Sequence, residues 1–145
     1  MRRFLRYAAI ALVVAAAAIQ FVQPERTNPP TDPAASYQAL AAPPQDAVAV
    51  LARACHDCHS NQTVWPWYSR VAPVSWLVAS DVKEGRARLN LSEWSHYNAG
   101  ASARLKKAMC KEVREGEMPE WPYKLMHPAA RLSAADIAAV CASAQ

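Results

Sequence analysis

The chain has 145 residues, which is the length of about one domain. Its formal net charge is +4, but three of its sixteen basic residues are arginines within the first six positions. Residues 24–145 therefore carry thirteen basic and twelve acidic side chains, and this near-neutral balance argues against a nucleic-acid-binding protein, which needs a basic face.

The amino-terminal segment has a basic start followed by an apolar run. Its three arginines precede residues 7–22, in which Gln20 is the only strongly polar side chain. This order is typical of an export signal, whose basic end stays in the cytoplasm. We expect residues 1–23 to form a signal peptide or a membrane-anchoring helix, because the apolar run approaches the ~20 residues that span a bilayer. The following domain is then expected in the periplasm, held to the inner membrane by this helix.

Residues 24–44 are rich in proline and lack the apolar periodicity of a core element. Six of the eleven prolines fall in this stretch. It is therefore predicted to be a linker that joins the first segment to a domain over residues 45–145.

Four helices are predicted in the domain, because apolar residues recur there at intervals of three or four. They cover about residues 46–59, 73–84, 102–115 and a segment that begins at Ser133. The second helix aligns Val74, Leu77, Val78 and Val82 on a face that we expect to point inward. No alternating strand pattern is found, so the fold class is all-α. Four short helices give a small hydrophobic core, which we expect to need a covalent cross-link or a cofactor.

A C-x-x-C-H motif ends the first of these helices. On a helical turn, Cys55 and Cys58 are three residues apart and Cys55 and His59 are four apart, so all three point to one side. Two thiols on one face can form thioethers with the two vinyl groups of a haem, and the next histidine then reaches the iron. The motif is the pattern of c-type haem attachment.

Three other readings of the motif are weaker. A thioredoxin-type pair begins a helix after a strand, whereas this pair ends a helix and no strand is predicted nearby. A zinc site needs further ligands, and the adjacent Cys58 and His59 are badly placed to share one tetrahedron. A plain disulfide between Cys55 and Cys58 leaves His59 without a role.

Further motifs follow in the stretches "CHDCHSNQTVWPWYSRVAPVSWLVASDVKEGRARLNLSEW" and "GEMPEWPYKLMHPAARLS". With the pieces W-P-W-Y-S, E-G-R, E-M-P and H-P-A-x-L-S in this order, the chain resembles the bacterial haem-binding domain family of the cytochrome c type. The resemblance covers about Ala47 to Ala144. It implies a small, mostly helical, cytochrome c-like domain around one covalent haem c per chain.

Bulky side chains are expected to form the wall of the haem pocket. The first candidates are Trp65, Trp67 and Tyr68, and the others are Trp76, Trp94, Trp121 and Tyr123, with ordinary core packing as the alternative for each. Arg70, Arg86 and Arg88 are candidates for the haem propionates, because a guanidinium matches a carboxylate in a bidentate way. The alternative for each arginine is a solvated surface charge.

The sixth iron ligand has several candidates. Met118 in "GEMPE" is favoured because its Met-Pro pair resembles that of many small cytochromes c, where a thioether sulfur raises the reduction potential. His127 is the main competitor, and Met126 is a third option. Met109 is expected in the core, while His56 is expected to be solvated.

Two further cysteines, Cys110 and Cys141, fall on the inward faces of the third and fourth predicted helices. In an exported protein, they are expected to form a disulfide or to remain as two small buried thiols.

The sequence therefore predicts an electron carrier rather than an enzyme, because no general acid–base array accompanies the haem motif. Its expected partners are redox proteins of the periplasm or the inner membrane. The alternative is a haem-based sensor of small ligands or a peroxidase-like enzyme, which would need a labile sixth coordination position.

Overall fold

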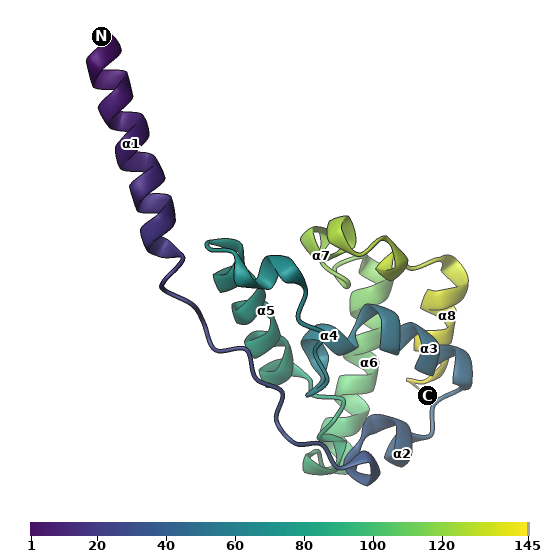
Figure 1. The fold of residues 1–145 in the computed structure, drawn as a ribbon. Coiled ribbons are helices and arrows are strands. Elements are labelled where there is room, and N and C mark those ends of the chain that lie inside the picture. Colours follow the sequence, from purple (N-terminus) through teal and green to yellow (C-terminus); the bar gives the residue numbers. More distant parts are fainter. Residues whose placement is uncertain (145) are drawn as a thin grey trace.

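The computed structural model describes residues 1–144, which form α-helices and short 3-10 helices with no strand (Figure 1). This confirms the all-α prediction. In chain order the elements are α1 (Arg2–Ile19), η1 (Pro33–Ala35), α2 (Tyr37–Ala41), α3 (Gln45–Ala54), α4 (His56–His59), η2 (Trp67–Arg70), α5 (Val74–Arg88), η3 (Trp94–His96), α6 (Ala99–Glu115), α7 (Trp121–Met126), η4 (Pro128–Ala130) and α8 (Ala134–Ala142).

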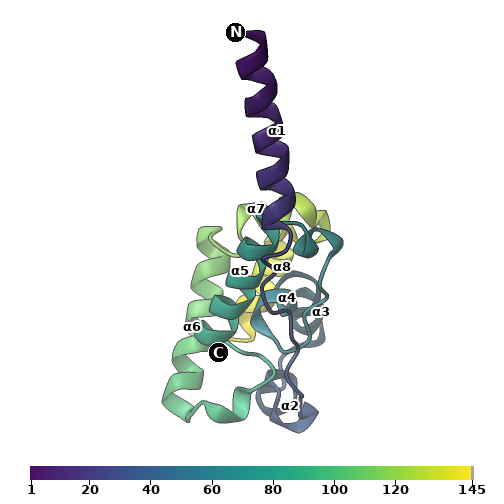
Figure 2. The ribbon, with the colours of Figure 1, turned by 60° about the vertical axis from the view of Figure 1, so that its left-hand side comes forward.

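Helix α1 projects away from all the other helices, and none of its residues is buried (Figures 1 and 2). It has 18 residues, and the three arginines of the amino-terminal segment lie within it. Across residues 1–144 no helix combines the length and the apolar character needed to cross a membrane, so the predicted membrane helix is not supported.

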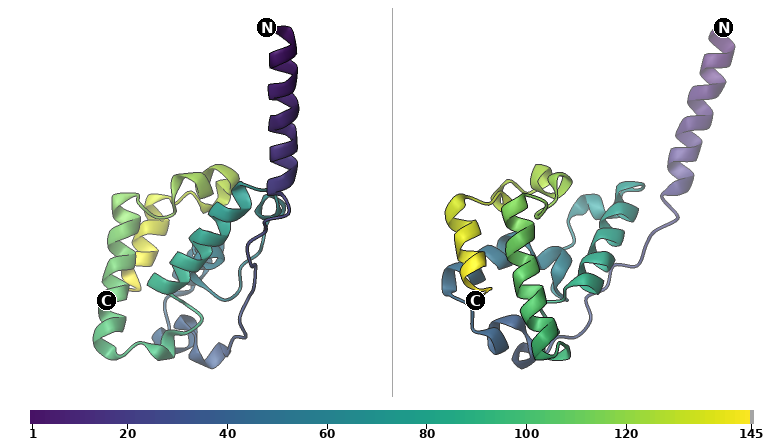
Figure 3. Two further views of the ribbon diagram at one scale, coloured as in Figure 1. Left: turned by 90° about the vertical axis from the view of Figure 1, so that its left-hand side faces the viewer. Right: turned by 180° about the vertical axis from the view of Figure 1, so that it is seen from behind.

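The core of the domain lies where α3, α6 and α8 meet α2 and η3. Helices α6 and α8 run side by side in both views of Figure 3, and α3 packs on α8. The buried cluster consists of Tyr37, Val50, Leu51, Leu91, Trp94, Met109, Val113 and Val140. Helix α5 lies outside this cluster and packs instead on α4 and η2.

Residues 24–44 pack on the domain instead of forming the predicted free linker. The reason is Tyr37, which is only 2% exposed and belongs to the core cluster. Its hydroxyl donates to the carbonyl of Ser143 at 3.1 Å, its backbone N–H donates to the carbonyl of Leu91 at 2.8 Å, and its ring meets the edge of Trp94. The segment therefore contributes part of the hydrophobic core.

Arg86 fixes the earlier part of the same segment to the domain. Its guanidinium donates to the Thr27 carbonyl and to Asn28 Oδ1, each at 2.9 Å. The same group donates to the Ser60 carbonyl and to Thr63 Oγ1, each at 2.8 Å. Through these hydrogen bonds, Arg86 joins α5 to the segment after α4 and to residues 24–44.

Two predicted helices differ from the observed ones. The helix predicted over residues 46–59 breaks at Cys55, whose φ of −127° separates α3 from α4. Helix α5 continues past Gly85, and its buried residues are Ser75, Val82 and Gly85, whereas Val74 and Leu77 are exposed. The prediction that the whole apolar face of this helix points inward is therefore wrong, because small residues make its close contact.

The other two predicted helices are confirmed, although α6 begins at Ala99, three residues before the predicted start. Helix α6 stops at Gly116, which has the left-handed φ of 78° that favours glycine. Helix α8 begins with a capping box in which Ser133 and Asp136 bond to each other's backbone N–H. Asp136 also pairs with Arg53 of α3 at 2.6 Å, so this cap fixes α8 against α3.

A disulfide joins Cys110 of α6 to Cys141 of α8, with a Cα–Cα distance of 4.6 Å. The sequence allowed either a disulfide or two buried thiols, and the structure contains the disulfide. It closes a loop with a sequence separation of 31 residues, and thereby fastens the carboxyl-terminal helix to the longest helix of the domain.

Replacing both cysteines, Cys110→Ser with Cys141→Ser, should lower the free energy of unfolding by about 3 kcal/mol, because the unfolded chain regains the entropy of the open loop. Urea denaturation followed by circular dichroism measures the change. Wild-type protein treated with a reductant should unfold at the same urea concentration as the double variant. Equal stability of the oxidised wild type and the variant would contradict the expectation.

Candidate functional site

The C-x-x-C-H motif forms one tight turn that begins at the break between α3 and α4. The backbone N–H groups of Cys58 and His59 both donate to the carbonyl of Cys55, at 3.3 and 2.9 Å. Both thiols are partly buried and free, so they do not form the disulfide that the sequence left as an alternative. Burial is the main cause that raises the pKa of Cys55 and that of Cys58 to about 12, so both are neutral thiols near pH 7.

The imidazole of His59 is held by α5 through one of its two nitrogens. Nδ1 lies 3.0 Å from the carbonyl oxygen of Gly85 and 3.1 Å from that of Leu89. Because both neighbours only accept hydrogen bonds, the network assigns the proton to Nδ1 and leaves a lone pair on Nε2. This arrangement is the usual one for a histidine that ligates a metal through Nε2, since the second bond fixes the tautomer and the ring.

Gly85 allows this approach of α5 to α4. A Cβ atom at this position would lie 2.6 Å from the carbonyl oxygen of Cys58 and 3.1 Å from its Cβ. No L side chain fits at such distances, so the glycine is needed for a close backbone contact rather than for an unusual φ. The contact places the carbonyl of Gly85 within reach of His59.

Two cavities, of about 220 and 210 Å³, meet at the motif. Both are lined by Cys55, His59, Arg88 and Met118. The first cavity extends between α5 and the segment 119–126, with Cys58 in its wall. The second extends from the end of α5 toward α6, where apolar side chains such as Leu105 and Met109 line it. The free thiols and His59 therefore face a divided, largely apolar space bounded by α5, α6 and α7.

Comparison with known protein families decides between the readings of this space. The sequence profile of the haem-binding domain family matches residues 14–145. The chain belongs to this family. No curated protein and no solved structure matches the chain. The cavities described above therefore lie in a haem-binding domain, and within residues 1–144 no group of three or more His, Cys, Asp or Glu is arranged for a metal ion alone.

The residues of the cavities fit a haem in their chemistry. Two neutral thiols, a histidine with a free Nε2 and a thioether sulfur surround an apolar space with an arginine at its border. Of the predicted propionate partners, Arg88 lines both cavities and Arg70 lines neither. Arg86 is hydrogen-bonded to residues 24–44 instead. Arg88 is thus the predicted arginine that could meet a propionate.

The candidates for the second axial ligand separate clearly. Met118 is partly buried and lines both cavities together with His59. Met126 lines only the first cavity and is 49% exposed. His127 lines neither cavity, because its Nε2 is hydrogen-bonded to the Tyr68 hydroxyl at 2.6 Å. The geometry therefore favours Met118.

The predicted aromatic wall is only partly present. Tyr68 and Tyr123 line the first cavity, whereas Trp65 and Trp67 line neither. Trp67 is 73% exposed, and the buried indole N–H of Trp65 has no hydrogen-bond partner within residues 1–144. Trp94 lies in the core, and the wall of the second cavity is built mainly from aliphatic side chains and methionines.

A network of side chains that the sequence did not indicate supports the wall of the first cavity. Tyr123 donates to Asp57 Oδ2 at 2.8 Å, and its ring stacks on His127 at a centroid distance of 4.2 Å. His127 in turn bonds to Tyr68. Burial is the main cause that raises the pKa of Tyr123, so this hydroxyl stays protonated. The network ties the cysteine turn, η2 and α7 together, and spacing gives no signal of such contacts between distant residues.

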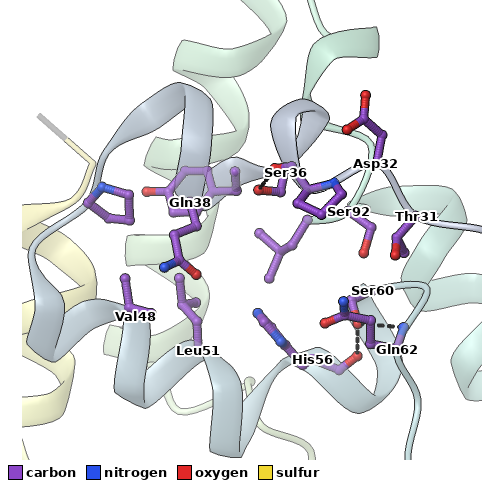
Figure 4. A pocket seen from close by; sticks show the side chains of 14 residues that line it. Thr31, Asp32, Ser36, Gln38, Val48, Leu51, His56, Ser60, Gln62 and Ser92 are labelled. Atoms are coloured by element: carbon purple, nitrogen blue, oxygen red, sulfur yellow. Dashed lines mark hydrogen bonds between the residues drawn. The ribbon is translucent and has the colours of Figure 1, made fainter.

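A third cavity, of about 150 Å³, lies on another side of the motif and shares none of its thiols (Figure 4). His56 of the motif points into this cavity, so the expectation that it is solvated holds only in part. Burial lowers the pKa of His56, which favours the neutral ring. The cavity is lined mainly by polar side chains, including Gln38, Ser60 and Ser92, and this polarity distinguishes it from the two cavities at the thiols.

The change Gly85→Ala should destabilise the domain by about 2 kcal/mol, because the added Cβ would push α5 away from Cys58. The shift should also weaken the hydrogen bonds that orient His59 and lower the fraction of chains that carry haem. Intact mass and thermal unfolding measure the two effects.

The matched control is Gly100→Ala near the start of α6. A Cβ there meets no atom closer than 3.5 Å, so this change should leave haem loading intact. Unchanged loading and stability in Gly85→Ala would show that the contact between α4 and α5 tolerates a side chain.

Proposed function

We propose that the chain is a c-type electron carrier with one covalent haem. The observation that carries the proposal is the pairing of His59, whose Nδ1 is occupied by two backbone carbonyls, with two free thiols around one apolar space. A bound haem would supply one-electron iron chemistry. Cys55 and Cys58 would each add a thiol across one vinyl group, and His59 Nε2 would ligate the iron.

Met118 is the proposed second axial ligand. It lines both cavities with His59, and a thioether at the iron favours the reduced state. A six-coordinate iron has no position for a small ligand, so this choice supports electron transfer over the sensor or peroxidase-like alternative. Arg88 would balance the charge of a propionate at the border of the two cavities.

Export of the domain is also part of the proposal. The arginines before the apolar run of α1 support it, because this order is typical of an export signal. The disulfide between α6 and α8 supports it independently, because such bonds persist in oxidising compartments. The redox partners would then be proteins of the periplasm or the inner membrane.

Haem should remain attached to the chain after denaturation. Co-expression with a haem-attachment system, followed by acid–acetone extraction and intact mass measurement, should give one haem per chain. Cys55→Ala with Cys58→Ala should abolish attachment, whereas His56→Ala, in the same turn but facing the third cavity, should leave it intact. Free extraction of the porphyrin from the wild type would rule out the proposal.

Ferric protein should show the weak long-wavelength absorption band of a methionine–iron bond. Met118→Ala should remove this band and lower the reduction potential, because the thioether stabilises ferrous iron. Met126→Ala is the matched control, since it changes a methionine that lines only the first cavity, and His127→Ala should also keep the band. Rapid binding of carbon monoxide by the reduced wild type would instead favour the sensor or enzyme alternative.

A periplasm-dependent reporter fused after Gln145 should be active, because the three arginines before the apolar run should keep the amino terminus in the cytoplasm. A fusion in which these arginines are changed to Glu is the control and should lose most of the activity. Activity of a cytoplasm-dependent reporter at the same position would overturn the proposed location.

A further inference from the structure

One surface beside the first cavity exposes large apolar side chains that no other element covers. It is formed by Val74 and Leu77 of α5 together with Trp121, Leu125 and Met126 of α7, and we call it the α5–α7 face. Leu77 is 53% exposed, Leu125 is 62% exposed and Trp121 is 73% exposed. A group of apolar side chains with this exposure is typical of a binding surface rather than of a free one.

Both helices line the first cavity, so the exposed apolar side chains of the face lie on the two elements that border the proposed haem site. Val74 and Met126 both line the first cavity. Leu77 lies between Val74 and Asp81 on the same side of α5, and Asp81 also lines the cavity. Trp121 and Leu125 are four residues apart on α7 and therefore lie on one side of that helix.

The border of the same cavity is acidic. Asp81, Glu84 and Glu120 line it, and the like charges of Glu120 and Glu84 add to burial in raising the pKa of Asp81. The basic groups nearby are Arg88, which lies 3.9 Å from Glu84, and Lys124, which donates to the Gly116 carbonyl at 3.3 Å. A haem propionate at Arg88 would leave the border with a negative charge.

We propose that the α5–α7 face docks a redox protein whose contact surface is basic around an apolar centre. This inference rests on the proposed electron-transfer function. An apolar centre with an exposed tryptophan and a charged border is the composition of a specific protein interface. The acidic border disfavours an anionic lipid surface and would steer a basic partner toward the haem. The partner's oxidised centre would accept one electron from a haem held by Cys55, Cys58 and His59, and no bond would form or break.

Binding of a fluorescent peptide of alternating lysine and leucine to the haem-loaded protein tests the face directly. Fluorescence anisotropy should show at least fivefold weaker binding to the double variant Glu84→Lys with Glu120→Lys. The matched control, Asp32→Lys with Asp46→Lys, makes the same change of charge before η1 and at the start of α3, away from α7 (Figure 1). The control should bind within twofold of the wild type, and equal weakening in both would overturn the proposal.

The apolar part is tested by Trp121→Ser against Trp67→Ser, which removes an equally exposed tryptophan outside the face. Only Trp121→Ser should weaken binding of the peptide. If the wild type co-sediments with phosphatidylcholine–phosphatidylglycerol vesicles and Trp121→Ser does not, the face binds lipid and the proposal is wrong.

Electron transfer supplies a separate readout. Hexaammineruthenium(II) should reduce the ferric protein by one electron and become ruthenium(III), and added salt should slow this reaction because it screens the acidic border. The Glu84→Lys with Glu120→Lys variant should lose most of the salt dependence. Peptide binding needs no electron transfer, and haem attachment is measured by mass, so failure of the docking face and failure of the proposed function give different results.

Discussion

The arrangement of the site depends on the close contact between the backbones of α4 and α5. Gly85 leaves no side chain between its helix and Cys58, and its carbonyl therefore reaches His59. This one contact fixes the tautomer of the histidine and the direction from which α5 borders both cavities. Arg86, the next residue of α5, adds four hydrogen bonds to the segment after α4 and to residues 27 and 28.

A disulfide and an ion pair support a domain whose hydrophobic core is small. The disulfide and the pair between Arg53 and Asp136 hold α3, α6 and α8 together. Helix α5 has no such link to α6, and the second cavity lies between the end of α5 and the middle of α6. A cofactor placed there would supply the apolar contact that two helices of this length otherwise make directly.

Much of the fold follows from short-range sequence signals. Gly116 and the Ser133–Asp136 box mark helix ends because capping depends on neighbouring residues, and the cysteine motif marks the site because its spacing is local. Three features escape such signals. Tyr37 lies in a proline-rich stretch but is buried through contacts with Leu91 and Ser143, more than 50 residues away.

The sequence pattern does not predict the buried face of α5 for a different reason. Its apolar residues suggested one face, yet burial follows the small residues Ser75 and Gly85, since the strength of a close contact depends on shape rather than on hydrophobicity. The hydrogen bond between His127 and Tyr68 likewise depends on a meeting of the end of α7 with η2 that no local pattern encodes. The sequence thus locates the motif of the site but not its walls.

The packing of residues 24–44 also determines what the domain can reach. A free chain of that length would let the domain rotate and search a wide volume around the point where the first helix is held. With Tyr37 in the core and Thr27 and Asn28 bound by Arg86, almost none of that length is free. Residues 24–44 therefore restrict how far the domain can move relative to the first helix, and the orientation of the one constrains that of the other.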